Sequence, residues 1–377
     1  MDVATLRIKG PGFDELPDWD SERTLVVVFF PPRWSGALDQ LATQFPRSQV
    51  VGCSTAGEIL DGVVSDDSAV AAVVRFDACG LASSTTTLGP GRRSFEAGSR
   101  LAADLAARAR RGEPLRAILA LSDGLGVNGS ELARGLSETL PPGVVVTGGL
   151  AGDGDRFERT SVLHGSVARS GAVTAVGFYG EAVDVRTGSQ GGWDVFGVER
   201  AVTRASGNVV YELDGRPILD LYREYLGERA AGLPATALLF PLALRCSRET
   251  THSLVRTVLG IDEAERSMRF AGDVPEGSLV QLMRANFDRL VQGASDAAAM
   301  TALRDDPRQC LVLAISCVGR RLVLGQRVEE ETEATLENFG PRARQIGFYS
   351  YGELSPAGGG TCELHNQTMT LTAILER

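Results

Sequence analysis

One pattern recurs three times along the chain, and it restricts the fold more than any other feature. An apolar, strand-like stretch leads through a helix-like stretch to a second apolar stretch, which ends in a glycine and an acidic residue. The three endings align without gaps: VVGCSTAGEI at 50–59, VVTGGLAGD at 145–153 and IGFYSYGEL at 346–354. Parallel strands need a crossover of this kind. The sequence therefore predicts one βαβ unit used three times, each ending in a Gly-acid turn.

Other segments predict antiparallel strands. Short apolar runs alternate with turn residues through 160–213, and the pattern becomes helix-like just after Asp214-Gly215. We therefore predict an α/β fold of two mixed halves: an N-terminal segment 1–22, a first domain 23–214 and a second domain 215–377. Ligands of open α/β sheets bind beyond the carboxyl ends of the strands, so we expect the functional site near the Gly-acid turns.

Charge and composition disfavour several classes of function. A net charge of -10 argues against binding to nucleic acid or to an anionic membrane surface. No apolar run approaches the roughly 20 residues that span a bilayer, and the acidic N-terminus is unlike a secretory signal, so we expect a cytoplasmic protein. Six cysteines without a Cys-x-x-Cys pair, and only three histidines, favour reduced thiols and no zinc site.

Residues 124–129, GLGVNG, match the G-x-G-x-x-G pattern of dinucleotide-binding loops. The acidic residue that should follow about 20 positions later is missing, because no acid comes before Asp153. The simpler interpretation is a glycine-rich βα loop. Preceded by Asp123, and with Gly124 and Gly126 in it, the loop could still offer backbone N–H groups to an anion such as a ligand carboxylate.

Cys53-Ser54 could be a nucleophile on a strand-to-helix turn. A thiol nucleophile needs a base and an orienting group, and His164 and His365 are the plausible bases. No complete G-x-S-x-G is present, so a hydrolase or transferase is a minor alternative. The more ordinary interpretation is that small residues fill a tight turn.

Two polar runs near the C-terminus suggest a pocket. His365 and Asn366 lie in a polar stretch before an apolar strand, and could close over a polar ligand. His365 could instead be an axial haem ligand, or simply a hydrogen-bonded histidine. Tyr349, Tyr351 and Glu353 form the second run, which suits an ammonium or amide group. The acids of the Gly-acid turns could equally cap or brace those turns.

Long ordered stretches resemble the FIST family. VVGCSTAGEI and SDGLGVNG through GGLAGDGDRFERT look like its N-terminal half, and GDVPEGSLVQLMRANFDRL and GFYSYGEL through CELHNQTMTL look like its C-terminal half. The resemblance implies an intracellular sensory module of signal transduction that binds small ligands such as amino acids. Some similar members bind haem and report nitric oxide to a histidine kinase. The family motifs fall on Gly52, Cys53, Ser54, Gly57, Glu58, Asp123, Gly124, Gly149, Gly152, Asp153, Tyr349, Tyr351, Gly352, Glu353, His365 and Asn366.

The sequence thus predicts a noncatalytic sensor that binds a small, amino-acid-like ligand between its two halves. Glu58 and Glu353 would contact a cationic group, and the 124–129 loop would receive an anionic one. Neither cofactor nor metal is expected, and the signal would pass to a separate protein such as a histidine kinase. The alternatives are a haem-binding nitric-oxide sensor that uses His365 or His164, and an enzyme dependent on Cys53.

Overall fold

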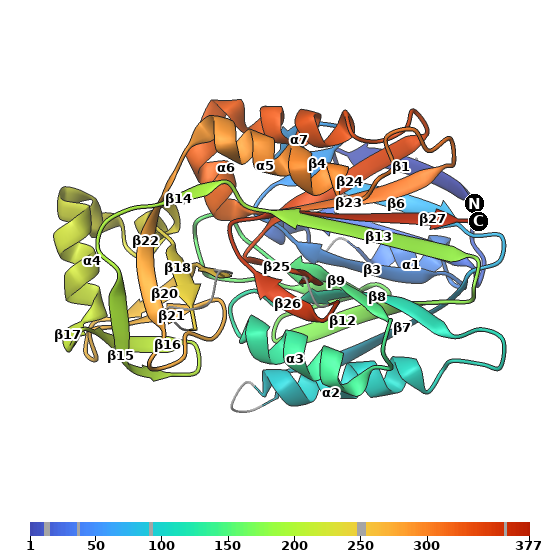
Figure 1. Ribbon diagram of the computed structural model, residues 1–377. Coiled ribbons are helices and arrows are strands. Elements are labelled where there is room, and N and C mark those ends of the chain that lie inside the picture. The colour runs from blue at the N-terminus through green and yellow to red at the C-terminus, as the bar shows by residue number, and fades with distance from the viewer. Residues whose placement is uncertain (11–15, 36–37, 90–92, 247–253, 358–359) are drawn as a thin grey trace.

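The computed structural model describes residues 1–377 except 11–15, 36–37, 90–92, 247–253 and 358–359. It consists of an α/β body and a smaller β-domain, residues 193–285, which lies at one end of the body (Figure 1). Parallel and antiparallel strands occur together in the body, which confirms the predicted α/β class. None of the helices in the described part of the chain is long and apolar enough to cross a membrane.

The body contains three six-stranded sheets with one common strand order. In each sheet two antiparallel strands precede a parallel pair, and an antiparallel hairpin completes the edge. The first sheet has the order β1 (Asp2–Ile8), β6 (Ala69–Arg75), β2 (Thr24–Phe30), β3 (Gln49–Ser54), β10 (Val162–His164), β11 (Val167–Arg169). The second has β7 (Gly80–Thr87), β12 (Ala172–Tyr179), β8 (Leu115–Ser122), β9 (Val145–Leu150), β25 (Gly352–Pro356), β26 (Cys362–His365). The third has β13 (Val183–Gln190), β27 (Met369–Glu376), β23 (Cys310–Cys317), β24 (Ala343–Ser350), β4 (Glu58–Leu60), β5 (Val63–Ser65).

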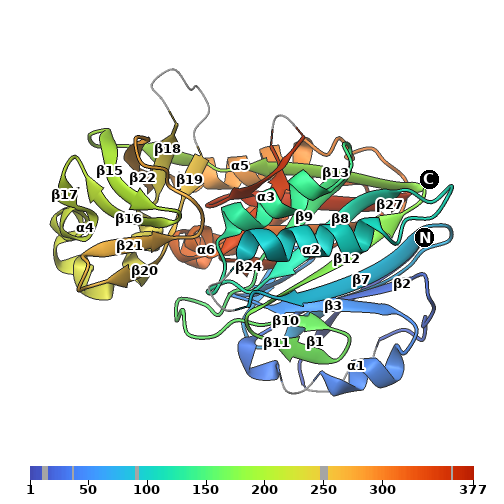
Figure 2. The same cartoon turned by 90° about the horizontal axis from the view of Figure 1, so that it is seen from below.

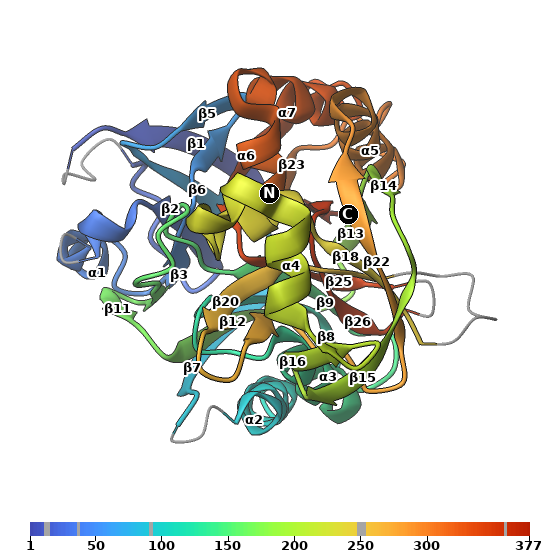
Figure 3. The ribbon, with the colours of Figure 1, turned by 90° about the vertical axis from the view of Figure 1, so that its left-hand side faces the viewer.

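The three parallel pairs are the three βαβ units predicted from the sequence. Strands β2 and β23 are apolar runs buried along their whole length, TLVVVFF and CLVLAISC, as is typical of parallel strands covered on both faces. The crossover helices are α1 (Asp39–Gln44), α3 (Gly129–Thr139), and α6 (Val318–Leu324) with α7 (Val328–Leu336). Helices α2 (Ser94–Ala106) and α5 (Phe287–Ala299) complete the outer layers, which lie on three sides of the body (Figure 3).

The inner faces of the three sheets pack into a common core. Its aromatic centre joins the first and third sheets, since the rings of Phe29 and Phe348 lie 4.6 Å apart. Leu119 and Leu121 of the second sheet belong to the same cluster. In Figure 2, α1 covers the outer side of the first sheet, and α2 and α3 lie side by side over the second.

After each Gly-acid turn the chain leaves its own sheet and joins a neighbouring one. β4 pairs with β24, β10 with β3, and β25 with β9, so the three sheets exchange hairpins in a closed cycle. Backbone hydrogen bonds then tie the turns together: Gly152 N to Ser54 O at 3.0 Å, Ala56 N to Tyr349 O at 2.9 Å and Tyr351 N to Leu150 O at 3.1 Å. The three turns therefore converge at the centre of the body, and the two sequence halves are interlocked.

The β-domain is a separate sheet with its own core under helix α4 (Ile218–Leu226). The predicted boundary near residue 214 falls inside it, between β16 and β17. Its strands are β14 (Trp193–Val195), β15 (Arg200–Ser206), β16 (Val209–Leu213), β17 (Arg216–Pro217), β18 (Leu242–Arg245), β19 (Leu254–Arg256), β20 (Val258–Asp262), β21 (Ser267–Phe270) and β22 (Leu279–Ala285). Short 3-10 helices occur at Pro32–Trp34, Gly227–Gly232, Ala235–Leu239 and Gly325–Arg327.

Candidate functional site

A cavity of about 470 Å³ lies beyond the carboxyl ends of β2 and β3, where the sequence predicts a ligand. We call it the Glu58 cavity. Pro31-Pro32 end β2 and start the 3-10 helix that carries Arg33 into one wall. The first Gly-acid turn and the segment after the second turn also line it. Its lining residues are Pro31, Pro32, Arg33, Thr55, Ala56, Gly57, Glu58, Asp66, Asp67, Gly154 and Arg156.

One oxygen of the Glu58 carboxyl has no hydrogen-bond partner in the described chain. Its Oε1 accepts a hydrogen bond from Thr55 Oγ1 at 2.5 Å, whereas its buried Oε2 has no partner among the described residues. The side chain is 1% exposed, and burial raises its pKa to about 8, against the opposing effect of the Thr55 hydrogen bond. Buried polar atoms are nearly always hydrogen-bonded. Among the described residues of the cavity lining, this oxygen therefore still lacks a donor.

Three arginines surround the cavity, and they differ in how fully they are paired. Arg33 pairs with Asp67 at 2.5 Å on the exposed rim. Arg321, whose guanidinium lies against Gly57, binds Asp66 with both terminal nitrogens at 2.7 and 2.6 Å, and this contact lowers the Asp66 pKa. Arg156 forms no ion pair with any residue that the structure describes. The cavity lining thus includes a buried acid, Glu58, and a guanidinium, Arg156, that has no ion pair among the described residues.

Asp153, the acid of the second turn, is a brace. Its carboxylate accepts backbone N–H bonds from Phe157, Glu158 and Arg159 at 2.8–3.0 Å, and the Tyr351 hydroxyl also donates to it. The result is a fixed loop, and this loop carries Arg156 to the edge of the Glu58 cavity. Asp153 and Tyr351 thereby position Arg156, although neither of them lines the cavity.

Glu353, the acid of the third turn, is fully enclosed. Its Oε1 accepts from Ser350 Oγ at 2.5 Å, and its Oε2 accepts from the N–H and the hydroxyl of Thr368 at 3.2 and 2.9 Å. Burial raises its pKa to about 8. Tyr349 is equally enclosed and donates its hydroxyl to Glu331 at 2.8 Å. Neither Glu353 nor Tyr349 lines the Glu58 cavity.

The glycine-rich loop uses its N–H groups internally. Asp123 Oδ1 accepts from the N–H groups of Leu125 and Gly126 at 2.9 and 2.7 Å, and the Gly124 N–H donates to Thr160 Oγ1 at 2.9 Å. These three donors are therefore already used by Asp123 and Thr160. Gly149 lies in the core, where an added Cβ would meet Ile315 and Phe348.

Cys53 and Ser54 occupy packed positions at the end of β3. Burial raises the pKa of the Cys53 thiol well above its ordinary value. Ser54 Oγ donates to the Gly152 carbonyl and accepts from the Ser161 N–H, both at 3.0 Å. His164 Nε2 lies 3.0 Å from Ser83 Oγ. Within the described residues neither Cys53 nor Ser54 is hydrogen-bonded to a histidine.

His365 and Asn366 line a different cavity, of about 590 Å³, between the body and the β-domain. We call it the interdomain cavity. His365 Nε2 lies 3.2 Å from the Ser355 carbonyl, and Asn366 Oδ1 accepts from the Thr257 N–H at 3.3 Å. The described lining contains neither Arg nor Lys, which would pair with the propionates of a haem. These residues therefore fit a haem poorly, and no group of three or more metal-ligating side chains occurs in the described chain.

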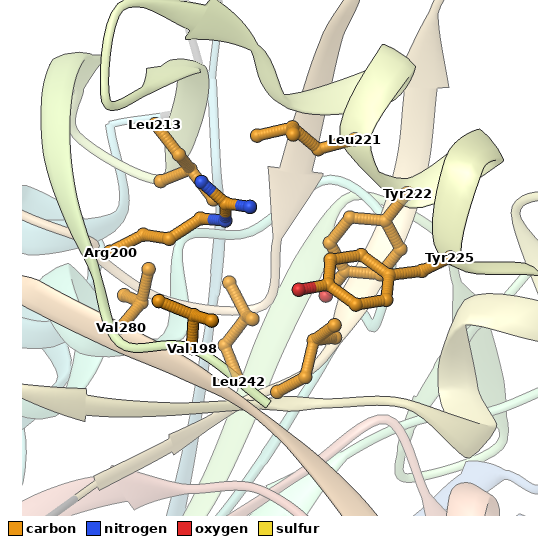
Figure 4. Close-up of a pocket in the computed structure, with 9 residues that line it drawn as sticks. Val198, Arg200, Leu213, Leu221, Tyr222, Tyr225, Leu242 and Val280 are labelled. Carbon is orange, nitrogen blue, oxygen red and sulfur yellow. The ribbon is translucent and has the colours of Figure 1, made fainter. Parts of the chain in front are cut away.

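A third hollow lies under α4 in the β-domain (Figure 4). Leu221, Tyr222 and Tyr225 of α4 face Arg200 across it, and the remaining lining is apolar. Its volume is about 20 Å³, room for roughly one water molecule. It is too small for a metabolite.

The structure thus divides the predicted residues. Gly57 and Glu58 line one cavity, His365 and Asn366 line another, and the remaining ones brace the turns or fill the core. Sequence reasoning missed Thr55, Arg33 and Arg156. The Pro-Pro pair that ends β2 marks the position of Arg33, but nothing local to Arg156 indicates that its loop crosses to the first sheet.

Two family models match this chain. The FIST N domain matches residues 24–216, and the FIST C domain matches residues 219–356. The chain belongs to the FIST family. FIST domains are sensory domains of signal transduction and are thought to bind small ligands. The resemblance predicted from the sequence is therefore confirmed.

Individual relatives add little detail. The chain is 26% identical over 236 residues to an uncharacterized protein of Methanocaldococcus jannaschii, and the match covers 56% of this chain and 45% of that protein. The chain thus spans less than half of this relative's length. A chorismatase crystal structure aligns over 99% of this chain and 98% of that one, with 10% identity and a TM-score of 0.39. Likeness at that level carries no argument about function.

Proposed function

We propose that this FIST protein is a noncatalytic sensor that binds a small cationic or zwitterionic ligand in the Glu58 cavity. The observation that supports it is the buried Glu58 Oε2, which has no partner among the described residues and lies at the carboxyl ends of two parallel strands. An ammonium or guanidinium group would donate to this oxygen. The volume of about 470 Å³ lies within the range of small-molecule pockets.

The rim favours a ligand that also carries a negative group. Arg156 has no ion pair with a described residue, and it lines the same cavity as Glu58. A carboxylate on the ligand would pair with this guanidinium, which suits planar anions. An α-amino acid satisfies both requirements. In this proposal Glu58 acts alone on the cationic group, because Glu353 lies enclosed elsewhere.

The test begins with native mass spectrometry of the purified protein and a thermal-shift screen of amino acids and amines. Binding of each hit is then measured by calorimetry with wild type, Glu58→Gln and Glu181→Gln, an acid-to-amide control at an exposed position. A hydrogen bond to a charged group contributes about 1.5–3 kcal/mol, so Glu58→Gln should weaken binding roughly 10- to 150-fold. Equal weakening by both variants, or none by either, would refute the assignment.

A further inference from the structure

The interdomain cavity is built by two parts of the molecule that share no sheet within the described chain. One wall comes from β13 and from Gly191–Trp193, which lead into the β-domain, and another from β19 and β22 inside that domain. The remaining wall comes from Met300 and from the chain around β26. Its volume of about 590 Å³ would hold a ring compound.

Trp193 lines this cavity, and its indole N–H is a hydrogen-bond donor that no described residue uses. The residue is 7% exposed, and its indole Nε1 has no partner among the described residues. An indole N–H donates and cannot accept. A buried donor of this kind normally meets an acceptor. The occupant of the cavity should therefore carry an acceptor such as a carbonyl oxygen or a ring nitrogen.

The rest of the lining separates into an apolar and a polar wall. Met283, Val255 and the Trp193 ring form the apolar wall, and methionine adapts readily to the shape of a ring. Thr187 and Gln190 of β13 lie in the polar wall. A flat molecule with one apolar face and polar edge groups matches this division.

Charge decides between ring compounds of the same shape. Glu363, on β26, is the one Asp, Glu, Lys or Arg in the described lining. An anionic group would thus enter beside a carboxylate and without an arginine or lysine partner among the described residues, which is unfavourable. The Glu58 cavity, in contrast, has two arginines in its lining. The two cavities therefore suit different ligands.

We propose that the interdomain cavity is a second ligand site, separate from the Glu58 cavity, which takes a neutral planar ring compound whose acceptor bonds to Trp193 Nε1. Because its walls belong to both the body and the β-domain, the occupant restrains one against the other. An aromatic amide is the simplest member of this class, and the matching aromatic carboxylate is its charged counterpart.

The test uses benzamide and benzoate, which share one ring and differ in charge. Trp193 becomes the only tryptophan in a Trp19→Phe/Trp34→Phe variant, so its fluorescence reports the site directly. Benzamide should change the emission in a saturable way, and benzoate should bind at least tenfold more weakly. In ligand-observed NMR, Trp193→Phe keeps an aromatic ring but loses the N–H, and should weaken benzamide several-fold. The same substitution at Trp19 is the matched control.

Three results would overturn the proposal: no saturable benzamide binding by fluorescence or NMR, benzoate binding as tightly as benzamide, or equal effects of Trp193→Phe and Trp19→Phe. The Glu58→Gln variant separates the two sites. It should leave benzamide affinity unchanged, and loss of benzamide binding in this variant would assign the ring to the Glu58 cavity instead. Failure of amines to bind Glu58 would leave the benzamide result intact.

Discussion

The buried ion pair between Arg320 and Glu331 should fasten the β-domain to the body. Both side chains are 0% exposed, and Arg320 contacts Glu331 Oε2 through Nε at 2.9 Å and a terminal nitrogen at 2.7 Å. Arg320 also donates to the Gly191 and Leu290 carbonyls, both at 2.8 Å. Gly191 precedes β14, and Leu290 lies in α5 just after β22. One guanidinium thus holds both chain connections of the β-domain.

Glu331→Gln leaves the Arg320 charge buried without a counter-charge. Breaking a buried pair by removing one partner costs about 3–5 kcal/mol, because the remaining charge stays desolvated. The Glu331 carboxylate also accepts from Ser316 and Tyr349 at 3.0 and 2.8 Å, which an amide oxygen can keep. We therefore expect the loss to come from the charge, and the melting temperature to fall by roughly 4–6 °C.

Calorimetry and urea unfolding measure this loss, and two further variants test its origin. Glu330→Gln changes the neighbouring residue of α7, whose pair with Arg327 is exposed, and should leave the melting temperature nearly unchanged. Arg320→Met/Glu331→Leu removes both charges and should be more stable than Glu331→Gln alone. If the double variant is no more stable, an uncompensated charge is not the cause, and the reasoning fails.

Four further outcomes follow from the same contacts. A cationic ligand requires ionised Glu58, whose pKa is raised to about 8. The affinity measured by calorimetry should therefore rise about tenfold per pH unit up to pH 8 and then level off. An affinity that does not change with pH would contradict the contact between the ligand and Glu58. In the folded state the pKa of Glu353 is raised from 4.5 to about 8. Between these pH values the folded state binds one more proton than the unfolded state, so the free energy of unfolding should fall as pH rises. Urea midpoints measured against pH should fall less steeply in Glu353→Gln. Iodoacetamide should label Cys246, the exposed cysteine, and spare buried Cys53 in the folded protein, as an intact-mass measurement followed by peptide mapping would check. Gly57→Ala should cost about 1–3 kcal/mol in urea unfolding, because φ is +129° there and a Cβ would meet the Arg321 guanidinium; a loss near zero would contradict this.

The three βαβ units could be predicted because their signals are local. A continuous apolar run such as TLVVVFF or CLVLAISC indicates a buried strand wherever it occurs. The exchange of hairpins could not be predicted, because nothing in a three-residue strand such as β4 or β10 indicates which sheet edge it joins. Strand partners are set by packing over long sequence separations.

The same limit applies to the site. Glu58, Asp153 and Glu353 are equivalent in sequence, yet residues far away in the chain decide their roles. Tyr351 donates to Asp153 across 198 positions, and Thr368 covers Glu353 from the start of another strand. Glu58 differs because its turn faces a cavity that no side chain of the described residues fills. The repeated pattern therefore predicted three candidate acids. Only tertiary contacts distinguish Glu58, which lines a cavity, from Asp153 and Glu353, whose carboxyl groups are enclosed by other residues.

The Glu58 cavity is connected to the β-domain by a continuous series of contacts. Arg321 binds Asp66 and donates to the Ala56 carbonyl at the cavity wall, and its guanidinium lies 5.4 Å from the centre of the Tyr349 ring. It is also one of the charges that lower the pKa of Glu58. A cation that binds Glu58 would therefore repel the Arg321 guanidinium.

From Tyr349 the contacts continue to the connection of the two parts. The Tyr349 hydroxyl donates to the same Glu331 carboxylate that holds Arg320, and Arg320 holds the Gly191 carbonyl. Coupling between distant sites requires a physical path and an element with two arrangements. The hydrogen bonds supply the path, and the β-domain, fastened at two connections by one guanidinium, is the element that can shift. A sensor of this design would respond to its ligand by changing how firmly Arg320 holds those connections.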